Sequence, residues 1–266
     1  MVARGSAEGI VLNEVAHVYP GERMPLRILD GISLRIGKGE FLALIGPSGC
    51  GKTTILDILS GLVPLQSGTM LVGGRPPAAG RPDTARMFAR DALLPWRTAF
   101  SNIEFAVSSR PHAQAGRKLI GPLLQAVGLE GFENSYPRQL SQGMRQRVAL
   151  ARTFSLESEF LFLDEPFGAL DAQTKLLLQD KLLELWERHR STVVLVSHDL
   201  GEAIALADRV VVMSGRPGRI IADLPIDIPR PRSVRALQKE RAYHDLYARL
   251  WDELERASAP AAPRQR

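Results

Sequence analysis

The chain has 266 residues, of which 45% are hydrophobic and 24% charged, and its net charge is +5 at pH 7. This composition fits one large globular domain, with or without a sub-domain, and the single cysteine, Cys50, excludes an internal disulfide. The absence of any run of about 18 apolar residues excludes a membrane-spanning helix, and we expect no secretory signal, because the N-terminus lacks an apolar core.

The first half of the chain predicts two kinds of strand. Ile10–Tyr19 and Ile32–Ile36 alternate apolar and polar residues, which is typical of half-buried antiparallel strands. Phe41–Ile45 is continuously apolar and predicts a buried parallel strand. A glycine-rich loop follows, and a helix is predicted over Thr53–Leu62. Prolines and glycines between residues 76 and 82 then indicate a loop.

The second half alternates helices and strands. Helical spacing of apolar residues predicts a helix over Arg117–Val127, and Ser141 is a suitable cap for another that ends near Phe154. Lys175–Arg188 is a leucine-rich helical segment. Three more buried strands are predicted, at Phe160–Leu163, Val193–Val196 and Val210–Met213. Such alternation predicts a parallel sheet that is covered on both faces.

The C-terminal part reads differently. Pro229–Arg232 predicts a hinge, and a last amphipathic helix follows, with its apolar side facing either its own domain or a partner. That side carries Tyr243, Tyr247, Leu250 and Leu254. The basic segment 258–266, rich in alanine and proline, is expected to be a flexible tail.

The loop after Phe41–Ile45 matches the phosphate-loop pattern in full. Its glycines let successive backbone N–H groups curl around a phosphate, and the following helix directs its positive end at the same anion. Lys52 is placed to reach the β- and γ-phosphates, and the Thr53 hydroxyl to bind Mg²⁺. The predicted ATP-binding residues of this loop are Gly46, Pro47, Ser48, Gly49, Cys50, Gly51, Lys52, Thr53 and Thr54.

Two acids end the strand at Phe160–Leu163. Asp164 is the second predicted Mg²⁺ ligand, and Glu165, which projects differently, is predicted to polarise the attacking water. His198 follows another strand of the same sheet. Because parallel strands place their carboxyl ends at one edge, His198 is expected near the γ-phosphate.

Leu140–Arg147 resembles the signature motif of the ATP-binding cassette (ABC) transporter family. Together with the motifs above, it makes most of the chain resemble that family. Ser141 and Gly143 at a helix N-terminus make a second anion site, with Gln142 and Met144 replacing commoner residues. The resemblance implies that two cassettes pack head to tail, so that the signature residues Ser141, Gln142, Gly143 and Met144 of one copy close over the phosphate loop of the other.

Further elements resemble the family in order along the chain. Tyr19 resembles its adenine-stacking aromatic, and Asp171 resembles the interface aspartate of its D-loop. The implied fold is α/β: a RecA-like phosphate-loop NTPase core with an antiparallel β-subdomain and an inserted α-helical subdomain. The expected cassette spans residues 10–230, with the insertion at about 98–154, and residues 231–266 form the C-terminal helix and tail.

Two motifs resemble the branch that serves nitrate, sulfonate and taurine importers: Leu93–Trp96 and Ser214–Ile220. One position departs from the family, because Ala89 stands where a glutamine usually helps to hold Mg²⁺ and couples the site to the membrane subunit. Alanine cannot ligate a metal. Arg90 and Asp91 are candidates to compensate, as is a water molecule in this position, and Mg²⁺ is still expected on Thr53 and Asp164.

The resemblance therefore implies an ATPase that uses ATP and Mg²⁺ and drives import through a separate transmembrane permease. Expected partners are a second copy of the chain, the permease and, indirectly, an extracytoplasmic solute-binding protein; the expected place is the cytoplasmic face of the inner membrane. Two alternatives stay open: a cassette ATPase acting on DNA or ribosomes, which the basic charge allows, and a regulatory module that binds ATP without turnover.

Overall fold

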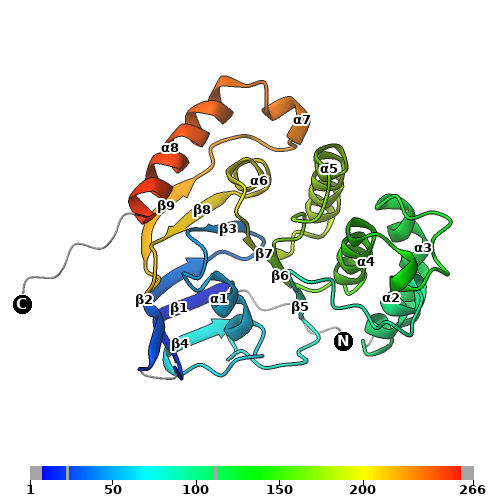
Figure 1. Ribbon diagram of the computed structural model, residues 1–266, viewed down its shortest axis with the longest axis horizontal. Coiled ribbons are helices and arrows are strands. Elements are labelled where there is room, and N and C mark those ends of the chain that lie inside the picture. Colours follow the sequence, from blue (N-terminus) through cyan, green and yellow to red (C-terminus); the bar gives the residue numbers. More distant parts are fainter. Residues whose placement is uncertain (1–7, 22–23, 111–112, 259–266) are drawn as a thin grey trace, which may run out of the picture.

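Two β-sheets enclose the first helix of the chain in the computed structural model, which describes residues 8–21, 24–110 and 113–258 (Figure 1). The smaller sheet is antiparallel, in the order β2-β1-β4. Its strands are β1 (Ile10–Tyr19), β2 (Leu26–Ile36) and β4 (Ser67–Val72). The second strand is longer than predicted, because its first residues pair with the end of β1, Tyr19 opposite Leu26, where burial no longer alternates.

The larger sheet has six strands in the order β5-β6-β7-β3-β8-β9. Five of them are parallel, and β9 pairs antiparallel with β8 at the edge. Their bounds are Thr84–Met87 (β5), Phe160–Asp164 (β6), Thr192–Val196 (β7), Phe41–Ile45 (β3), Arg209–Met213 (β8) and Ile220–Pro225 (β9). The predicted parallel sheet is confirmed, and the carboxyl ends of its five parallel strands meet at one edge.

Helix α1 (Lys52–Leu59) lies between the two sheets (Figure 1). Its buried residues join one apolar cluster with side chains of both sheets, including Leu12 of β1 and Leu44 of β3. The helix is shorter than predicted. At Gly61 the backbone takes a φ of +72°, and a Cβ there would lie 2.3 Å from the Ala78 carbonyl carbon, so the chain turns away before Leu62.

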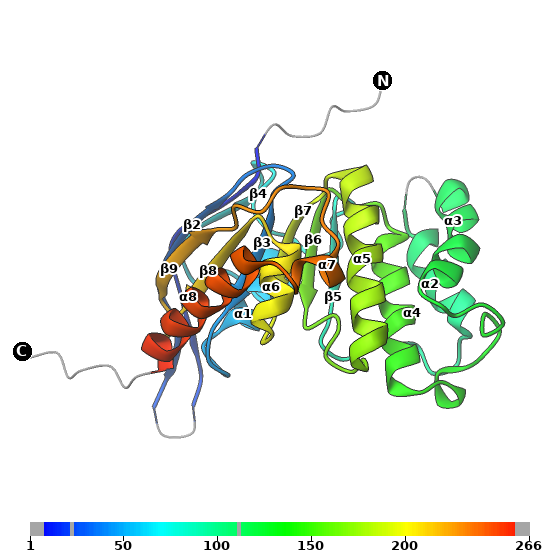
Figure 2. The ribbon, with the colours of Figure 1, turned by 90° about the horizontal axis from the view of Figure 1, so that it is seen from above.

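Three helices pack together beyond β5, at the end of the molecule opposite α8 (Figure 2). They are α2 (Ala99–Ser108), α3 (Ala113–Ala126) and α4 (Gln142–Phe154), with the short 3₁₀ turn η1 (Pro137–Gln139) before α4. Thr98 and Ser101 form a reciprocal capping box at the start of α2. Ser141 caps α4 as predicted, since its hydroxyl accepts a hydrogen bond from the Met144 N–H at 3.2 Å.

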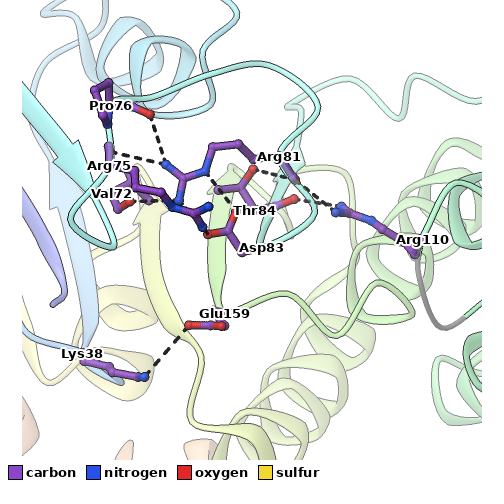
Figure 3. A network of polar contacts seen from close by, with 9 residues as sticks. All are labelled: Lys38, Val72, Arg75, Pro76, Arg81, Asp83, Thr84, Arg110 and Glu159. Carbon is purple, nitrogen blue, oxygen red and sulfur yellow. Dashed lines mark hydrogen bonds and ion pairs between the residues drawn. The ribbon is translucent and has the colours of Figure 1, made fainter. Parts of the chain in front are cut away.

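A polar network ties this helical region to the amino end of β5 (Figure 3). Arg110, two residues after the end of α2, donates hydrogen bonds to the carbonyls of Arg81 at 3.0 Å and Thr84 at 2.8 Å. Arg81 in turn binds the Asp83 carboxylate at 2.6 Å. The network therefore fixes the helical region to the sheet at the edge remote from the carboxyl ends of the strands.

The face of the large sheet that points away from α1 is covered by four further helices. They are α5 (Ala172–His189), α6 (Leu200–Leu206), α7 (Val234–Leu237) and α8 (Arg241–Ser258). Helix α8 contacts α6, β8 and β9 and buries Leu250 fully, so its apolar side packs on its own domain. Tyr247 and Trp251 of this helix remain partly exposed. The expected tail lies outside the described residues, apart from Ser258.

The hinge predicted at Pro229–Arg232 is wrong. Arg232 is only 9% exposed and donates hydrogen bonds to backbone carbonyls that include those of Ala207 at 2.6 Å and Ile228 at 2.7 Å. Arg230 donates to Asp208 at 2.8 Å and lies over the Trp186 ring. Proline restricts the backbone here, and the two arginines anchor it. Within the described part of the chain, no helix has the length and apolar character needed to cross a membrane.

Candidate nucleotide-binding site

The phosphate loop connects β3 to α1 at the carboxyl edge of the large sheet. The helix begins at Lys52 after Gly51, whose φ is +104°. A Cβ at Gly51 would lie 2.5 Å from Leu29 Cδ2, so only glycine fits at this position. The loop therefore presents backbone N–H groups and a helix N-terminus toward the space above it, which suits a phosphate.

A cleft of 270 Å³ opens over this loop. The predicted residues that line it are Ser48, Gly49, Gly51, Lys52, Thr53, Thr54, Glu165 and His198. Ile28, Val196 and Arg216 complete the lining. The structure thus brings the phosphate loop, one of the two strand-end acids and the histidine together, although residues 53 and 198 are far apart in the sequence.

Four residues predicted to bind ATP do not line the cleft. Cys50 is a completely buried residue of the loop, and the carbonyls of Gly46 and Pro47 accept hydrogen bonds from the Lys52 ammonium at 2.7 and 3.0 Å. Tyr19, at the end of β1, places its ring 4.6 Å from that of His17. Gly46, Pro47 and Cys50 thus shape the loop from within it, and Tyr19 lies at the end of β1; none of the four is among the residues that line the cleft.

Asp164 and Thr53 bring two hard oxygen donors together. Asp164 ends β6, its side chain is 2% exposed, and its Oδ1 lies 3.4 Å from the Thr53 hydroxyl. Mg²⁺ prefers such oxygen ligands and takes most of the remainder from phosphates and water. Among the described residues no three His, Cys, Asp or Glu side chains form a metal cluster. The donor set fits a Mg²⁺ ion that arrives with a nucleotide.

Glu165 and His198 both line the cleft and contact each other there. The His198 Nε2 lies 2.6 Å from Glu165 Oε1, and the two side chains are 46% and 38% exposed. Glu165 has a φ of +48°, while its N–H donates to the Val196 carbonyl at 2.9 Å. This left-handed backbone turns the Glu165 side chain away from the direction that Asp164 takes, so the two neighbouring acids occupy different environments.

The signature residues lie apart from this cleft. Ser141, Gln142, Gly143 and Met144 form the amino end of α4 in the helical region and are not among the lining residues. A Cβ at Gly143 would meet the Ala169 carbonyl at 3.3 Å. Asp171 caps α5 by accepting a hydrogen bond from the Thr174 N–H at 3.0 Å. The N-termini of α1 and α4, the two helix ends predicted to bind anions, are therefore separate within one chain.

Ala89 is exposed, next to the partly exposed Phe88. Asp91, one of the residues expected to compensate for the missing glutamine, is already engaged: its carboxylate accepts a hydrogen bond from Arg145 of α4 at 2.8 Å. Arg152 of the same helix donates to the Asp91 carbonyl at 2.9 Å. Asp91 thus anchors this segment to the helical region.

Sequence reasoning missed three polar side chains around the site. Arg216 lines the cleft from the β8–β9 loop, and its Nε donates to the Gly49 carbonyl at 3.3 Å. Arg86 on β5 binds Asp164 at 2.9 Å. Gln146 of α4 is buried and bridges the Glu165 carbonyl at 2.9 Å and the Ala169 N–H at 2.8 Å. Only Arg216 had a detectable signal, since its loop follows a parallel strand at the edge that carries the site.

The phosphate loop, the paired acids and the parallel sheet define a phosphate-loop nucleotide-binding protein. The ABC transporter family matches residues 29–168, and the chain belongs to that family. It is a cassette ATPase of the predicted fold.

Two curated relatives extend over most of the chain. The nitrate import ATP-binding protein NrtD of Synechococcus elongatus is 42% identical and aligns with 92% of this chain and 91% of its own length. The bicarbonate transport ATP-binding protein CmpD of the same species is 40% identical over 89% and 87% of the two chains. A solved dimer of the cassette MJ0796 in a post-hydrolysis state with ADP and Pi has a TM-score of 0.74 and 25% identity, covering 83% of this chain and 100% of that one.

Proposed function

We propose that this chain is the ATP-hydrolysing subunit of an ABC importer and works as a head-to-tail homodimer on a separate transmembrane permease. The observation that carries the proposal is the separation of its two anion-binding helix ends. The phosphate loop lies in the cleft, whereas Ser141 and Gly143 lie on α4, outside it. A second copy is needed to bring a signature end to the cleft of the first.

In this proposal the phosphate loop binds the ATP phosphates, with Lys52 moving from the loop carbonyls to the nucleotide. Thr53 and Asp164 hold Mg²⁺, which supplies charge neutralisation to the phosphates when bound. Glu165 accepts a proton from the attacking water or orients that water, and His198 contacts the γ-phosphate. Tyr19 is assigned to adenine and Asp171 to the dimer interface, in a cassette that spans residues 10–230.

The permease is proposed to dock near Phe88–Trp96. Trp96 is 70% exposed and Phe88 38% exposed, so this segment offers two aromatic side chains to a partner. The names of the two relatives, one for nitrate import and one for bicarbonate transport, support a small solute as cargo. Within that range we propose a nitrate, sulfonate or taurine type of solute, delivered by an extracytoplasmic binding protein to a complex whose ATPase lies on the cytoplasmic face of the inner membrane.

A pull-down from detergent-solubilised native membranes tests this assignment. Tagged wild-type protein is expected to recover a multi-span permease in an amount equal to a cassette pair. Trp96→Ala should lose the permease, while Trp251→Ala, which removes another exposed tryptophan on α8, should keep it. Recovery only from the soluble fraction, with nucleic acid or ribosomes attached, would contradict the importer and favour the alternative cassette ATPase.

A further inference from the structure

Arg86 on β5 lies between two acids that belong to different elements. Its Nη2 is 2.9 Å from Asp164 Oδ2 at the end of β6 and 3.0 Å from Asp57 Oδ1 on α1. The arginine side chain is 7% exposed. Its Nη1 also donates to the Met87 carbonyl at 3.0 Å, so both terminal nitrogens of the guanidinium have acceptors.

Arg86 is the charged partner of the buried Asp164 carboxylate. A carboxylate with 2% exposure is costly to keep ionised unless it is paired and hydrogen-bonded. Among the described residues its other side-chain partner is the Thr53 hydroxyl, at 3.4 Å from Oδ1. Arg86 therefore supplies the counter-charge on Oδ2, and the carboxylate is left with Oδ1 directed toward Thr53 and the phosphate loop.

Arg86 is itself held from the other side. Its Cζ lies 5.2 Å from the centre of the Phe88 ring, which is a cation–π contact. The next residue in the chain is Ala89. No amide side chain extends from position 89 toward the nucleotide. The same strand end provides Arg86 three residues earlier, and its guanidinium reaches Asp164.

We infer that Arg86 is a positioning residue, which fixes the Asp164 carboxylate for Mg²⁺·ATP in a site that lacks the side-chain amide at position 89. The inference rests on the proposed roles of Thr53 and Asp164 as magnesium ligands. Groups that orient a metal ligand typically change metal affinity by about 10–100-fold when they are removed. An ion pair with a structural role alone has no such effect on the metal.

Purified Arg86→Met tests the role, because methionine fills space without charge. Binding of a non-hydrolysable ATP analogue is measured in EDTA and across a Mg²⁺ titration. We expect the Mg²⁺ concentration for half-maximal enhancement of binding to rise about 10-fold or more, with affinity in EDTA changed less than about 2-fold. Arg86→Lys should restore part of the effect, since it keeps the charge without the planar fork.

Arg81→Met is the matched control. Arg81 is also nearly buried, at 10% exposure, and binds Asp83 at 2.6 Å in the network remote from the cleft (Figure 3). It should leave the Mg²⁺ titration unchanged even if it lowers stability. Equal Mg²⁺ dependence in folded Arg86→Met and the wild type would overturn the inference, as would parallel losses in EDTA and in Mg²⁺. A wild-type chain that binds the analogue independently of Mg²⁺ would refute the proposed ligands themselves.

Discussion

Asp164 and Glu165 are neighbours in the sequence, yet their environments differ. Asp164 is 2% exposed and paired with Arg86, whereas the Glu165 side chain is 38% exposed and meets His198 at 2.6 Å. The left-handed φ of Glu165 separates the two side chains. A buried, paired carboxylate suits a fixed ligand, and a partly hydrated one beside an imidazole suits proton transfer. The two environments thus support the two different roles proposed for the acids at this strand end.

The largest expected effect is on turnover. Glu165→Gln keeps the shape of the side chain but cannot accept a proton, so we expect ATP hydrolysis to fall by about 10²–10⁴-fold, while ATP binding persists and traps a dimer. Steady-state ATPase assays and size-exclusion chromatography with ATP measure both results. Glu157→Gln, at another glutamate with a positive φ of 44° but away from the cleft, is the control. Normal turnover by Glu165→Gln would remove it from the proposed chemistry.

The two acids should also differ in how much their substitution lowers the free energy of unfolding. Asp164→Asn leaves buried Arg86 with one fewer anionic partner, and we expect it to lower the free energy of unfolding by about 1–3 kcal/mol. Glu165→Gln should change it by less than about 0.5 kcal/mol, because its site is open to solvent. Urea unfolding without nucleotide gives both values. Equal losses in the two variants would break the contrast between the buried and the open carboxylate.

A third acid extends the comparison to pH. Glu202 on α6 is 3% exposed and lies 3.1 Å from Lys175, which also binds Asp199 at 2.7 Å. Burial raises the pKa of Glu202 to about 7, against the opposing effect of Lys175. Between its ordinary value of 4.5 and about 7, the folded state holds a proton that the unfolded state has lost, so this group makes the free energy of unfolding fall as pH rises.

Glu202→Gln should remove that pH dependence. Relative to the variant, the wild type is expected to lose roughly 1–3 kcal/mol of stability from about pH 5 to about pH 8. Urea unfolding of both proteins at a series of pH values measures the difference, with Glu184→Gln, an exposed glutamate on α5, as the control. A constant difference between wild type and Glu202→Gln across this range would mean that Glu202 is ionised throughout.

The sequence predicted those parts of the molecule that depend on local pattern. Continuous apolar runs gave the strands β3, β6, β7 and β8, and the glycine spacing gave the phosphate loop. The short strand β5 was missed because Thr84–Met87 includes Arg86 and has no apolar run. The contact of that arginine with Asp164 spans 78 positions in the sequence and depends on strand order, which no local pattern contains. The adenine-stacking role of Tyr19 was predicted from the family resemblance alone. The contact of its ring with His17 arises at the end of β1 and could not be predicted from the sequence pattern.

The smallest expected effect is that of Arg216, an exposed arginine that can be compared with the nearly buried Arg86. Arg216 is exposed at the cleft, where water and salt screen its charge, whereas the Arg86 side chain is only 7% exposed. Arg216→Ala should therefore weaken ATP binding only about 2–5-fold, the value of roughly 0.5–1 kcal/mol for an exposed ionic contact. Titration with ATP in EDTA measures the contribution of Arg216 to ATP affinity without that of Mg²⁺.

Arg219→Ala is the control for Arg216, because Arg219 belongs to the same loop but pairs with Asp30 and does not line the cleft. Increasing salt should reduce the difference between Arg216→Ala and the wild type, since the contact is screened. A loss much greater than about 10-fold, insensitive to salt, would place Arg216 in a desolvated contact with the nucleotide. In that case the β8–β9 loop would close over the phosphates. The exposure of Arg216 and Arg86 in the free chain would then not predict how much each contributes to nucleotide binding.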